Sequence, residues 1–259
     1  MLMEVIQRVE EWQRVRGGTA FSGRTVGFVP TMGALHEGHA ALLERARREN
    51  DVVVLSIFVN PTQFNDPRDH EKYPRTWEHD LAVARSANVD WIFAPVGDDM
   101  YRDDYRFHLS ENTFSATLEG PHRPGHFDGV LTVVLKLLLL VRPDRAYFGE
   151  KDLQQLLLVR DMVAAFFLPT KIVGCPTVRA PDGLALSSRN ARLSPAARAK
   201  APEFSRILRE ERDPVAARTK LAAAGFDVDY VENFQNWRLG AVRIEGVRLI
   251  DNVRCENPL

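Results

Sequence analysis

Short apolar runs alternate with longer amphipathic segments over the first two thirds of the chain. The runs are rich in β-branched residues and apolar along their length, which is typical of strands buried on both faces of a sheet. We predict strands at 25–30, 52–59, 90–95, 145–150 and 171–178. Helical patterns lie between most of them, at 39–48, 76–87, 130–141 and 153–167. The alternation predicts an α/β fold, with a Rossmann-like parallel sheet and helices on both faces.

The pattern changes after about residue 178. The segment 179–208 holds few large apolar residues and no clear buried strand. A helical pattern follows at 213–224, and apolar runs follow at 228–234 and 247–253. We therefore predict two domains: a larger parallel-sheet domain over 1–177, and a smaller α+β domain with a short antiparallel sheet over 178–259.

Neither apolar nor charged segments indicate a membrane protein. Residues 1–18 have the pattern of a charged amphipathic helix without the apolar core of a signal peptide. The most apolar run, 130–141, is shorter than the ~20 residues that span a bilayer, and Lys136 interrupts it. We interpret it as a buried helix and expect a cytoplasmic protein.

Composition narrows the class of partners. The 259 residues include 34 Lys+Arg and 35 Asp+Glu, so the net charge of -1 gives no reason to expect nucleic-acid binding. Cys175 and Cys255 stand far apart and without metal-ligand spacing, which predicts two reduced thiols. A balanced net charge is still compatible with binding of an anionic small molecule, which needs only a few well-placed cationic side chains.

The string "VPTMGALHEGH" joins the strand at 25–30 to the following helix. Gly33 allows a tight turn and Gly38 allows close approach of a ligand to the backbone. The helix start offers free N–H groups and a positive dipole end, an anion site. His36 and His39 stand beside that site, where imidazoles can donate to phosphate oxygens. Zinc is a poor alternative because no third ligand is evident nearby.

Two further segments carry residues suited to phosphate. "GEKD" follows the strand at 145–150 and places Lys151 at the ligand side of the sheet. Asp152 could bind Mg²⁺ or its waters, or could cap the helix that follows, and the two readings are compatible. "SSRN" brings two hydroxyls and Arg189, whose guanidinium can bind phosphate oxygens bidentately.

A pair of histidines elsewhere is interpreted as structural. His122 and His126 stand four residues apart, a spacing that suits a metal on a helix. Pro121, Pro124 and Gly125 predict a loop instead, with solvated or hydrogen-bonded histidines.

Taken together, these blocks resemble one family. "HEGH" resembles the HxGH signature of nucleotidyl-transfer enzymes, and "VPTMGALHEGH" resembles the pantothenate synthetase (pantoate–β-alanine ligase) family in particular. "SIFVNPTQF", "YPRT", "RPGHFDGV", "FGEKDLQQL", "DGLALSSRN" and "RLIDN" resemble that family's other blocks and occur in its order. The resemblance covers about residues 2 to 253.

The resemblance implies a two-step ligase reaction. Pantoate's carboxylate attacks the α-phosphate of ATP, and the amine of β-alanine then attacks the pantoyl adenylate, giving pantothenate and AMP. It also implies Mg²⁺ with ATP and a homodimer formed through the larger domain.

The resemblance assigns roles to residues. His39, His36, Lys151 and Arg189 are the catalytic candidates, with His39 at the proton-donor position. The implied ATP-binding residues are Met32, Gly33, His36, Gly38, His39, Gly149, Lys151, Asp152, Val178, Leu186, Ser187, Ser188 and Arg189. Gln63, Gln155, Asn60 and Arg123 are implied for pantoate and β-alanine, and Met32, Phe64 and Val134 are candidates for an apolar wall.

One departure and two rival interpretations remain. The stretch around "FQNW" is shorter than in the family, which predicts either weaker packing of the small domain or a trimmed loop. A nucleotidylyltransferase would also use HxGH, but Gln63 and Gln155 lie in the ligase family's own blocks. A non-catalytic nucleotide-binding protein would be expected to lack Lys151 or one of the histidines.

Overall fold

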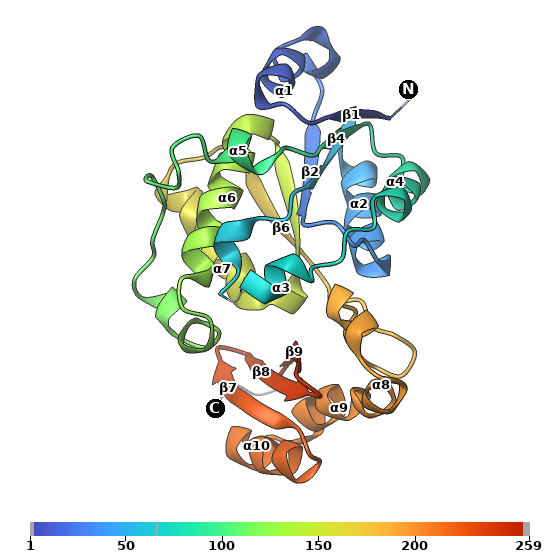
Figure 1. The fold of residues 1–259 in the computed structure, drawn as a ribbon, viewed down its shortest axis with the longest axis vertical. Coiled ribbons are helices and arrows are strands. Elements are labelled where there is room, and N and C mark those ends of the chain that lie inside the picture. Colours follow the sequence, from blue (N-terminus) through green and yellow to red (C-terminus); the bar gives the residue numbers. More distant parts are fainter. Residues whose placement is uncertain (1–2, 66, 256–259) are drawn as a thin grey trace.

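A computed structural model describes residues 3–65 and 67–255 of the chain. The predicted domain ranges, 1–177 and 178–259, therefore include residues 1–2, 66 and 256–259, which lie outside the described part. Figure 1 shows a large α/β unit at the amino-terminal end and a smaller unit, with a separate sheet, below it. We refer to residues 178–255 as the small domain, keeping the predicted boundary, which stays a prediction.

The larger unit is built on a six-stranded sheet, and all its pairings are parallel. In space the strands follow the order β1-β4-β3-β2-β5-β6. Their bounds are β1 Glu4–Ile6, β2 Val26–Thr31, β3 Val52–Ile57, β4 Trp91–Phe93, β5 Arg145–Gly149 and β6 Lys171–Cys175. The predicted strands and the predicted fold class are confirmed.

Two groups of helices cover the sheet (Figure 1). Helices α1 (Val9–Arg16), α6 (His126–Val141) and α7 (Leu153–Ala165) pack on one face, and α2 (Glu37–Glu49) and α4 (Trp77–Ser86) pack on the other. Within β3, Val52 and Val54 join the first core, whereas Val53 and Leu55 join the second. This alternation explains why a strand buried on both faces is apolar throughout.

Shorter elements complete the chain, and none of the helices within residues 3–65 and 67–255 is both long and apolar enough to cross a membrane. The remaining helices are α3 Pro67–Glu71, α5 Gly97–Met100, α8 Pro195–Lys200, α9 Pro202–Glu210 and α10 Pro214–Ala223.

The amino terminus differs from the prediction. We expected one amphipathic helix over residues 1–18, but residues 4–6 form β1 and only Val9–Arg16 is helical. Ile6 is buried and pairs in register with Phe93 of β4. Pairing with an exposed sheet edge therefore overrides the local helical pattern.

Helix α6 begins earlier than predicted, at His126 rather than 130. Gly125 precedes it with φ 75°, a left-handed conformation that glycine adopts without strain. Gly129 lies in its first turns, where a Cβ atom would come within 2.3 Å of the Thr62 carbonyl oxygen. The absent side chain lets α6 pack directly against the segment that carries Gln63.

The small domain contains a three-stranded antiparallel sheet, as predicted, with the order β7-β8-β9. The bounds are β7 Asp227–Phe234, β8 Trp237–Ile244 and β9 Val247–Arg254. The sequence pattern identified β7 and β9 but missed β8, α8 and α9. Residues 235–236 form a two-residue hairpin turn with Gln235 at φ 52°, so the "FQNW" stretch joins β7 directly to β8, and the trimmed loop stays a prediction.

The strand order reverses between β2 and β5. Helices α2 and α4 follow β2 and β3 toward one edge, whereas α6 returns the chain to β5 beside β2. In open parallel sheets, ligands bind beyond the carboxyl ends of the strands at such a switch point. Strands β2, β3 and β5 end at this edge, at Thr31, Ile57 and Gly149, and the segments that follow them begin there. The small domain lies on the same side of the sheet (Figure 1).

Candidate active site

A cavity of about 230 Å³ lies beyond the carboxyl ends of β2 and β5. Most residues predicted for the site line it, although they come from four separate parts of the chain. These are Met32, His36, Gly38, His39, Gln63, Gly149, Lys151, Asp152, Gln155, Val178, Leu186, Ser187, Ser188 and Arg189. Gly33, Asn60 and Arg123 do not line this cavity and are described separately.

The two histidines form a reciprocal cap on α2. The His36 backbone N–H donates to Nδ1 of His39 at 3.2 Å, and the Gly38 N–H donates to Nδ1 of His36 at 3.1 Å. Each Nδ1 is thus an acceptor, which assigns the neutral proton to Nε2 on both rings. A Cβ on Gly38 would lie 2.8 Å from the His36 ring, so glycine is needed there.

Burial keeps both imidazoles neutral. Burial, together with the nearby charge of Lys151, lowers the pKa of His36 to about 4. Burial and repulsion from His36 and Lys151 together lower the pKa of His39 to about 3. At neutral pH the pair therefore presents two N–H donors at the start of α2, where the helix dipole also favours an anion.

A buried carboxylate that the sequence analysis missed shapes the turn before these histidines. Asp80 of α4 accepts the backbone N–H groups of Ala34 at 3.1 Å and Leu35 at 2.8 Å. Gly33 has φ 78°, and a Cβ there would lie 2.9 Å from Asp80. Gly33 therefore shapes the turn before the histidines through its backbone conformation and does not line the cavity.

Lys151 enters the cavity from the end of β5. Its side chain is 17% exposed, and its ammonium lies 3.9 Å from the Asp152 carboxylate. Asp152 makes no side-chain cap on α7, so the capping interpretation has no hydrogen bond to support it. Asn252 of β9 donates to the carbonyl oxygens of Glu150 and Lys151, at 2.8 and 2.9 Å. The small domain thus supports the backbone that carries the lysine.

The "SSRN" segment of the small domain also lines the cavity. Ser187 accepts the backbone N–H of Arg189 at 3.2 Å, and Leu186 donates its N–H to the Val178 carbonyl at 3.0 Å. Within the described residues, the Arg189 guanidinium has no ion-pair partner. Burial raises the pKa of Tyr73, whose hydroxyl bonds Ser188. Tyr73 also lines the cavity, and the sequence analysis missed it.

Amide side chains form the third side. Asn60 is 1% exposed and donates to Gln63 Oε1 at 3.1 Å and to the Gly129 carbonyl at 3.2 Å. Its own oxygen accepts the Tyr101 hydroxyl at 2.6 Å. Asn60 therefore orients Gln63 and is itself set back from the cavity, while Gln155 faces it directly.

An apolar wall lies beside these amides. Met32 and Val134 line the cavity as predicted, and the sequence analysis missed four more residues there: Phe58, Val130, Val133 and Leu137. Phe64 does not line it, because its ring packs against His70 and Tyr73 at centroid distances of 5.2 and 5.8 Å. That prediction for Phe64 is not supported by the geometry.

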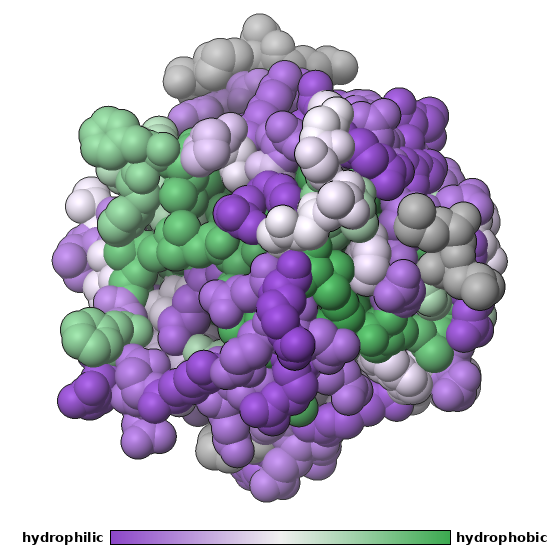
Figure 2. Space-filling view, turned by 90° about the horizontal axis from the view of Figure 1, so that it is seen from above, coloured by the Kyte–Doolittle hydropathy of each residue, from purple (hydrophilic) through white to green (hydrophobic). Residues whose placement is uncertain are grey.

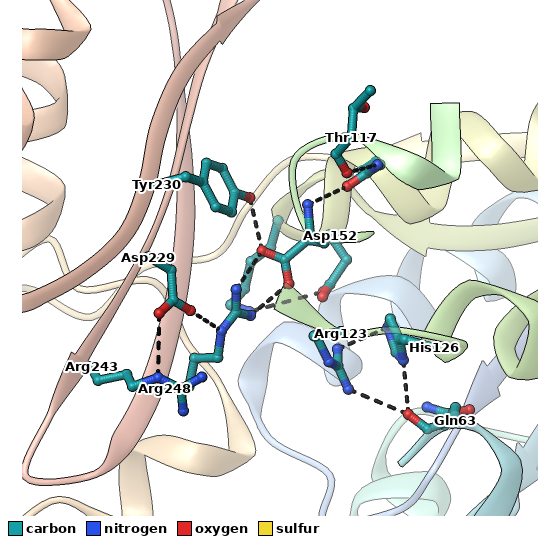
Figure 3. A network of polar contacts seen from close by, with 12 residues as sticks. Gln63, Thr117, Arg123, His126, Asp152, Asp229, Tyr230, Arg243 and Arg248 are labelled. Carbon is teal, nitrogen blue, oxygen red and sulfur yellow. Dashed lines mark hydrogen bonds and ion pairs between the residues drawn. The ribbon is translucent and has the colours of Figure 1, made fainter. Parts of the chain in front are cut away.

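Arg123 lines a second, smaller cavity, which Lys151, Asp152 and Gln155 join to the first. Its guanidinium lies 2.8 Å from Nε2 of His126, and His126 Nδ1 lies 2.9 Å from the Gln63 carbonyl oxygen. The His126 ring thus donates from Nδ1 and accepts at Nε2 (Figure 3). Burial lowers the pKa of Arg123 to about 10, so it stays charged at neutral pH.

The other histidines and the cysteines have structural surroundings. His126 starts α6 and is not in a loop as expected, because Gly125 caps the helix; its hydrogen-bonded role is as predicted. His122 stacks on Tyr230 at 5.6 Å. Within the described residues, no group of three or more His, Cys, Asp or Glu is placed to hold a metal. Cys175 and Cys255 are both free thiols.

A parallel α/β sheet, with a cation-rich cavity beyond its strands at the switch point, defines the scaffold of a nucleotide-binding enzyme. The family model described as "Pantoate-beta-alanine ligase" matches residues 3–254. The chain belongs to the pantoate–β-alanine ligase family.

Relatives agree with this assignment. The chain is 56% identical to the pantothenate synthetase of Bdellovibrio bacteriovorus over 95% of each chain. It is 48% identical to that of Legionella pneumophila (strain Lens), over 96% of this chain and 99% of the relative. A crystal structure of pantoate-beta-alanine ligase from Francisella tularensis, complexed with beta-gamma ATP and beta-alanine, superposes with a TM-score of 0.94 at 41% identity, covering 99% of each chain.

The neutral histidines predict a pH dependence of stability. Their pKa values are lower in the folded protein than the ordinary 6.5, so below pH 6.5 the unfolded chain binds more protons. The free energy of unfolding is therefore not reduced by these histidines above pH 6.5, and it decreases as the pH drops from 6.5 toward 4. Between pH 7 and pH 5 the free energy of unfolding should decrease by up to about 2 kcal/mol less in His36→Asn than in the wild type.

Urea denaturation of both proteins at pH 7 and pH 5 measures this difference. His108, which is exposed at the surface and does not line the cavity, provides the matched control as His108→Asn. Equal losses of stability in wild type and His36→Asn would contradict the neutral, buried imidazole.

Proposed function

We propose that the chain condenses (R)-pantoate with β-alanine in two steps at this cavity, using ATP. Pantoate's carboxylate displaces pyrophosphate from the α-phosphate, and the β-alanine amine then displaces AMP from pantoyl adenylate. One observation carries the proposal: phosphate-binding donors and substrate-binding amides, from sequence blocks far apart, line a single cavity. The functions named for the relatives support it, as does the Francisella tularensis complex with beta-gamma ATP and beta-alanine.

The phosphates of ATP bind at the start of α2 in this proposal. Nε2–H of His36 and Nε2–H of His39 donate to phosphate oxygens, and the α2 dipole adds to their effect. Lys151 and Arg189 line the same cavity and balance the charge that spreads over the oxygens in the transition state. The other residues assigned to ATP binding in this proposal are Met32, Gly33, Gly38, Gly149, Asp152, Val178, Leu186, Ser187 and Ser188.

Both histidines act as neutral donors. A neutral imidazole N–H can stabilise charge on an oxygen without first losing a proton to solvent, and a bound triphosphate would raise the pKa of each ring. The two rings lie side by side, with centroids 4.1 Å apart. Two neighbouring N–H donors suit contacts to the α-phosphate and to the leaving pyrophosphate together.

Pantoate lies between the amides and the apolar wall. Gln63 and Gln155 bind its hydroxyl and carboxylate oxygens, because an amide both donates and accepts. Asn60 contributes by orienting Gln63. The gem-dimethyl group packs against Met32 and Val134, which line the same cavity.

β-Alanine enters from the side of the smaller cavity. Arg123 binds its carboxylate, and the free amine then faces the acyl carbon of the adenylate. The C–N bond forms as the acyl–phosphate bond breaks, AMP leaves with that electron pair, and the amine loses a proton.

Mg²⁺ belongs with ATP in this proposal and not with the resting protein. Asp152 is 49% exposed and offers the cavity one carboxylate, which suits an ion that keeps its waters and the phosphate oxygens. When bound, Mg²⁺ would offset negative charge on those phosphates. A resident metal does not fit, since the described residues hold no cluster of ligands.

The products of the reaction test the proposal. We expect AMP and pyrophosphate from ATP and pantoate, and pantothenate only when β-alanine is added as well, as measured by end-point chromatography. Release of ADP and inorganic phosphate would instead indicate a phosphorylated intermediate and contradict the adenylate.

Removing a donor should slow the first step. Lys151→Ala and His39→Ala should each reduce pyrophosphate release from ATP and pantoate by a factor on the order of 10² or more. Lys171→Ala, an exposed lysine on the edge strand β6, is the matched control and should retain the wild-type rate. Near-normal rates in both site variants would mean that the site is elsewhere.

We also propose a cytoplasmic homodimer formed through the larger domain. Figure 2 shows apolar residues gathered on one side of the face that looks away from the small domain. Leu139, near the end of α6, is 57% exposed, and Phe167, after α7, is 93% exposed. Large exposed apolar side chains are typical of subunit contacts.

A charge placed on this surface should separate the subunits. We expect Phe167→Glu to shift the mass in multi-angle light scattering from a dimer toward a monomer at micromolar concentration. Val215→Glu, on the small domain and 71% exposed, is the control and should leave the mass unchanged. A Phe167→Glu protein that stays dimeric would place the contact on another surface.

A further inference from the structure

A buried carboxylate joins the two parts of the molecule beside the smaller cavity. Glu119 is 7% exposed and accepts the Tyr230 hydroxyl at 2.8 Å. Arg248 of β9 donates to both of its oxygens, at 2.6 and 3.0 Å. Arg248 also bonds Asp229 at 2.6 Å, and Figure 3 shows it lying between these carboxylates.

The fork of Arg248 satisfies Glu119 fully. A bidentate guanidinium–carboxylate pair is the strongest form of this contact, and Tyr230 adds a third donor. Burial works to lower the pKa of Arg248, but the hydrogen bonds to Glu119 and Asp229 raise it above its ordinary value. Glu119 is therefore held by partners of the small domain, although it belongs to the larger one.

Arg123, which lines the same cavity, is left without a carboxylate. Among the described residues, its nitrogen atoms hydrogen-bond neutral groups alone, Nε2 of His126 at 2.8 Å and the Gln63 carbonyl oxygen at 3.5 Å. Within residues 3–65 and 67–255, no ion pair involves Arg123. Yet Glu119 is close enough for its charge to raise the pKa of Arg123 against the effect of burial and Arg189.

We propose that Arg248 is a positioning residue that holds Glu119 away from Arg123 and so keeps that guanidinium free for the carboxylate of the amine substrate. This rests on the proposed function, because it deepens the role assigned to Arg123. A buried carboxylate without a partner is costly, so it pairs with whichever cation is in reach. Once Arg248 is gone, Arg123 is that cation.

The same contact ties substrate binding to the position of the small domain. Arg248 and Tyr230 lie on β9 and β7, whereas Glu119 and Arg123 lie on the larger domain. Glu119 can bond Arg248 and Tyr230 only when the small-domain sheet packs against residues 119–123. Arg123 is therefore available to a substrate carboxylate when the small domain is packed in this position.

Substitutions at the two ends of the pair test this. Arg248→Met should raise KM for β-alanine on the order of tenfold or more, because Glu119 then competes for Arg123. Pyrophosphate release from ATP and pantoate, which needs no β-alanine, should change little. Adding Glu119→Gln to Arg248→Met removes the competing charge and should return KM to within about threefold of wild type.

Arg243→Met is the matched control. Arg243 belongs to the same cluster and bonds Asp229 at 3.3 Å, but it does not contact Glu119. It should leave KM for β-alanine unchanged. Should Arg248→Met fail to fold, Arg248→Lys keeps the cation but loses the fork, and we expect a smaller rise of KM in the same direction.

The outcomes separate this inference from the proposed function. If Arg123→Gln leaves KM for β-alanine unchanged, the carboxylate site assigned to Arg123 is wrong, and the inference fails with it. If Arg123→Gln raises KM but Glu119→Gln gives the Arg248→Met protein no rescue, only the inference is overturned. Arg248 would then serve to anchor the small domain alone.

Discussion

The site depends on the two hydrogen bonds by which the imidazoles of His36 and His39 accept backbone N–H groups at the start of α2. His36 caps the helix and His39 returns a bond to the His36 backbone, as serine and glutamate do in an ordinary capping box. Because both Nδ1 atoms are used inside the protein, both Nε2–H groups are available to a ligand. One local contact thus fixes the helix start, the tautomers, the neutral charge state and the direction of two donors.

Much of the larger domain could be predicted from the sequence. Strands buried on both faces are apolar throughout, so β2, β3 and β5 are evident without any knowledge of their neighbours. The candidate residues near them could be predicted for the same reason, since each follows directly on a buried strand. His36, Gln63 and Lys151 are far apart in sequence, but the carboxyl ends of parallel strands meet at one edge.

The elements that were missed depend on tertiary contacts. β1 is three residues long and forms because an edge of β4 is available to pair with it. Asp80 and Tyr73 lie in helical or loop segments that carry no phosphate motif, and only the fold brings them to the turn and the cavity. Glu119 likewise gave no signal in the sequence, because its partners, Tyr230 and Arg248, lie more than a hundred residues away.

The contact of Asn252 with the carbonyl groups of Glu150 and Lys151 bears on the order in which the protein acquires activity during synthesis. The parallel sheet uses strands that end at Cys175, so it can assemble while the rest of the chain is still being made. The support beneath the backbone of Lys151 is added only with β9. A nascent or truncated chain would thus hold a folded parallel sheet before it could consume ATP, and activity would appear only after β9 has been made.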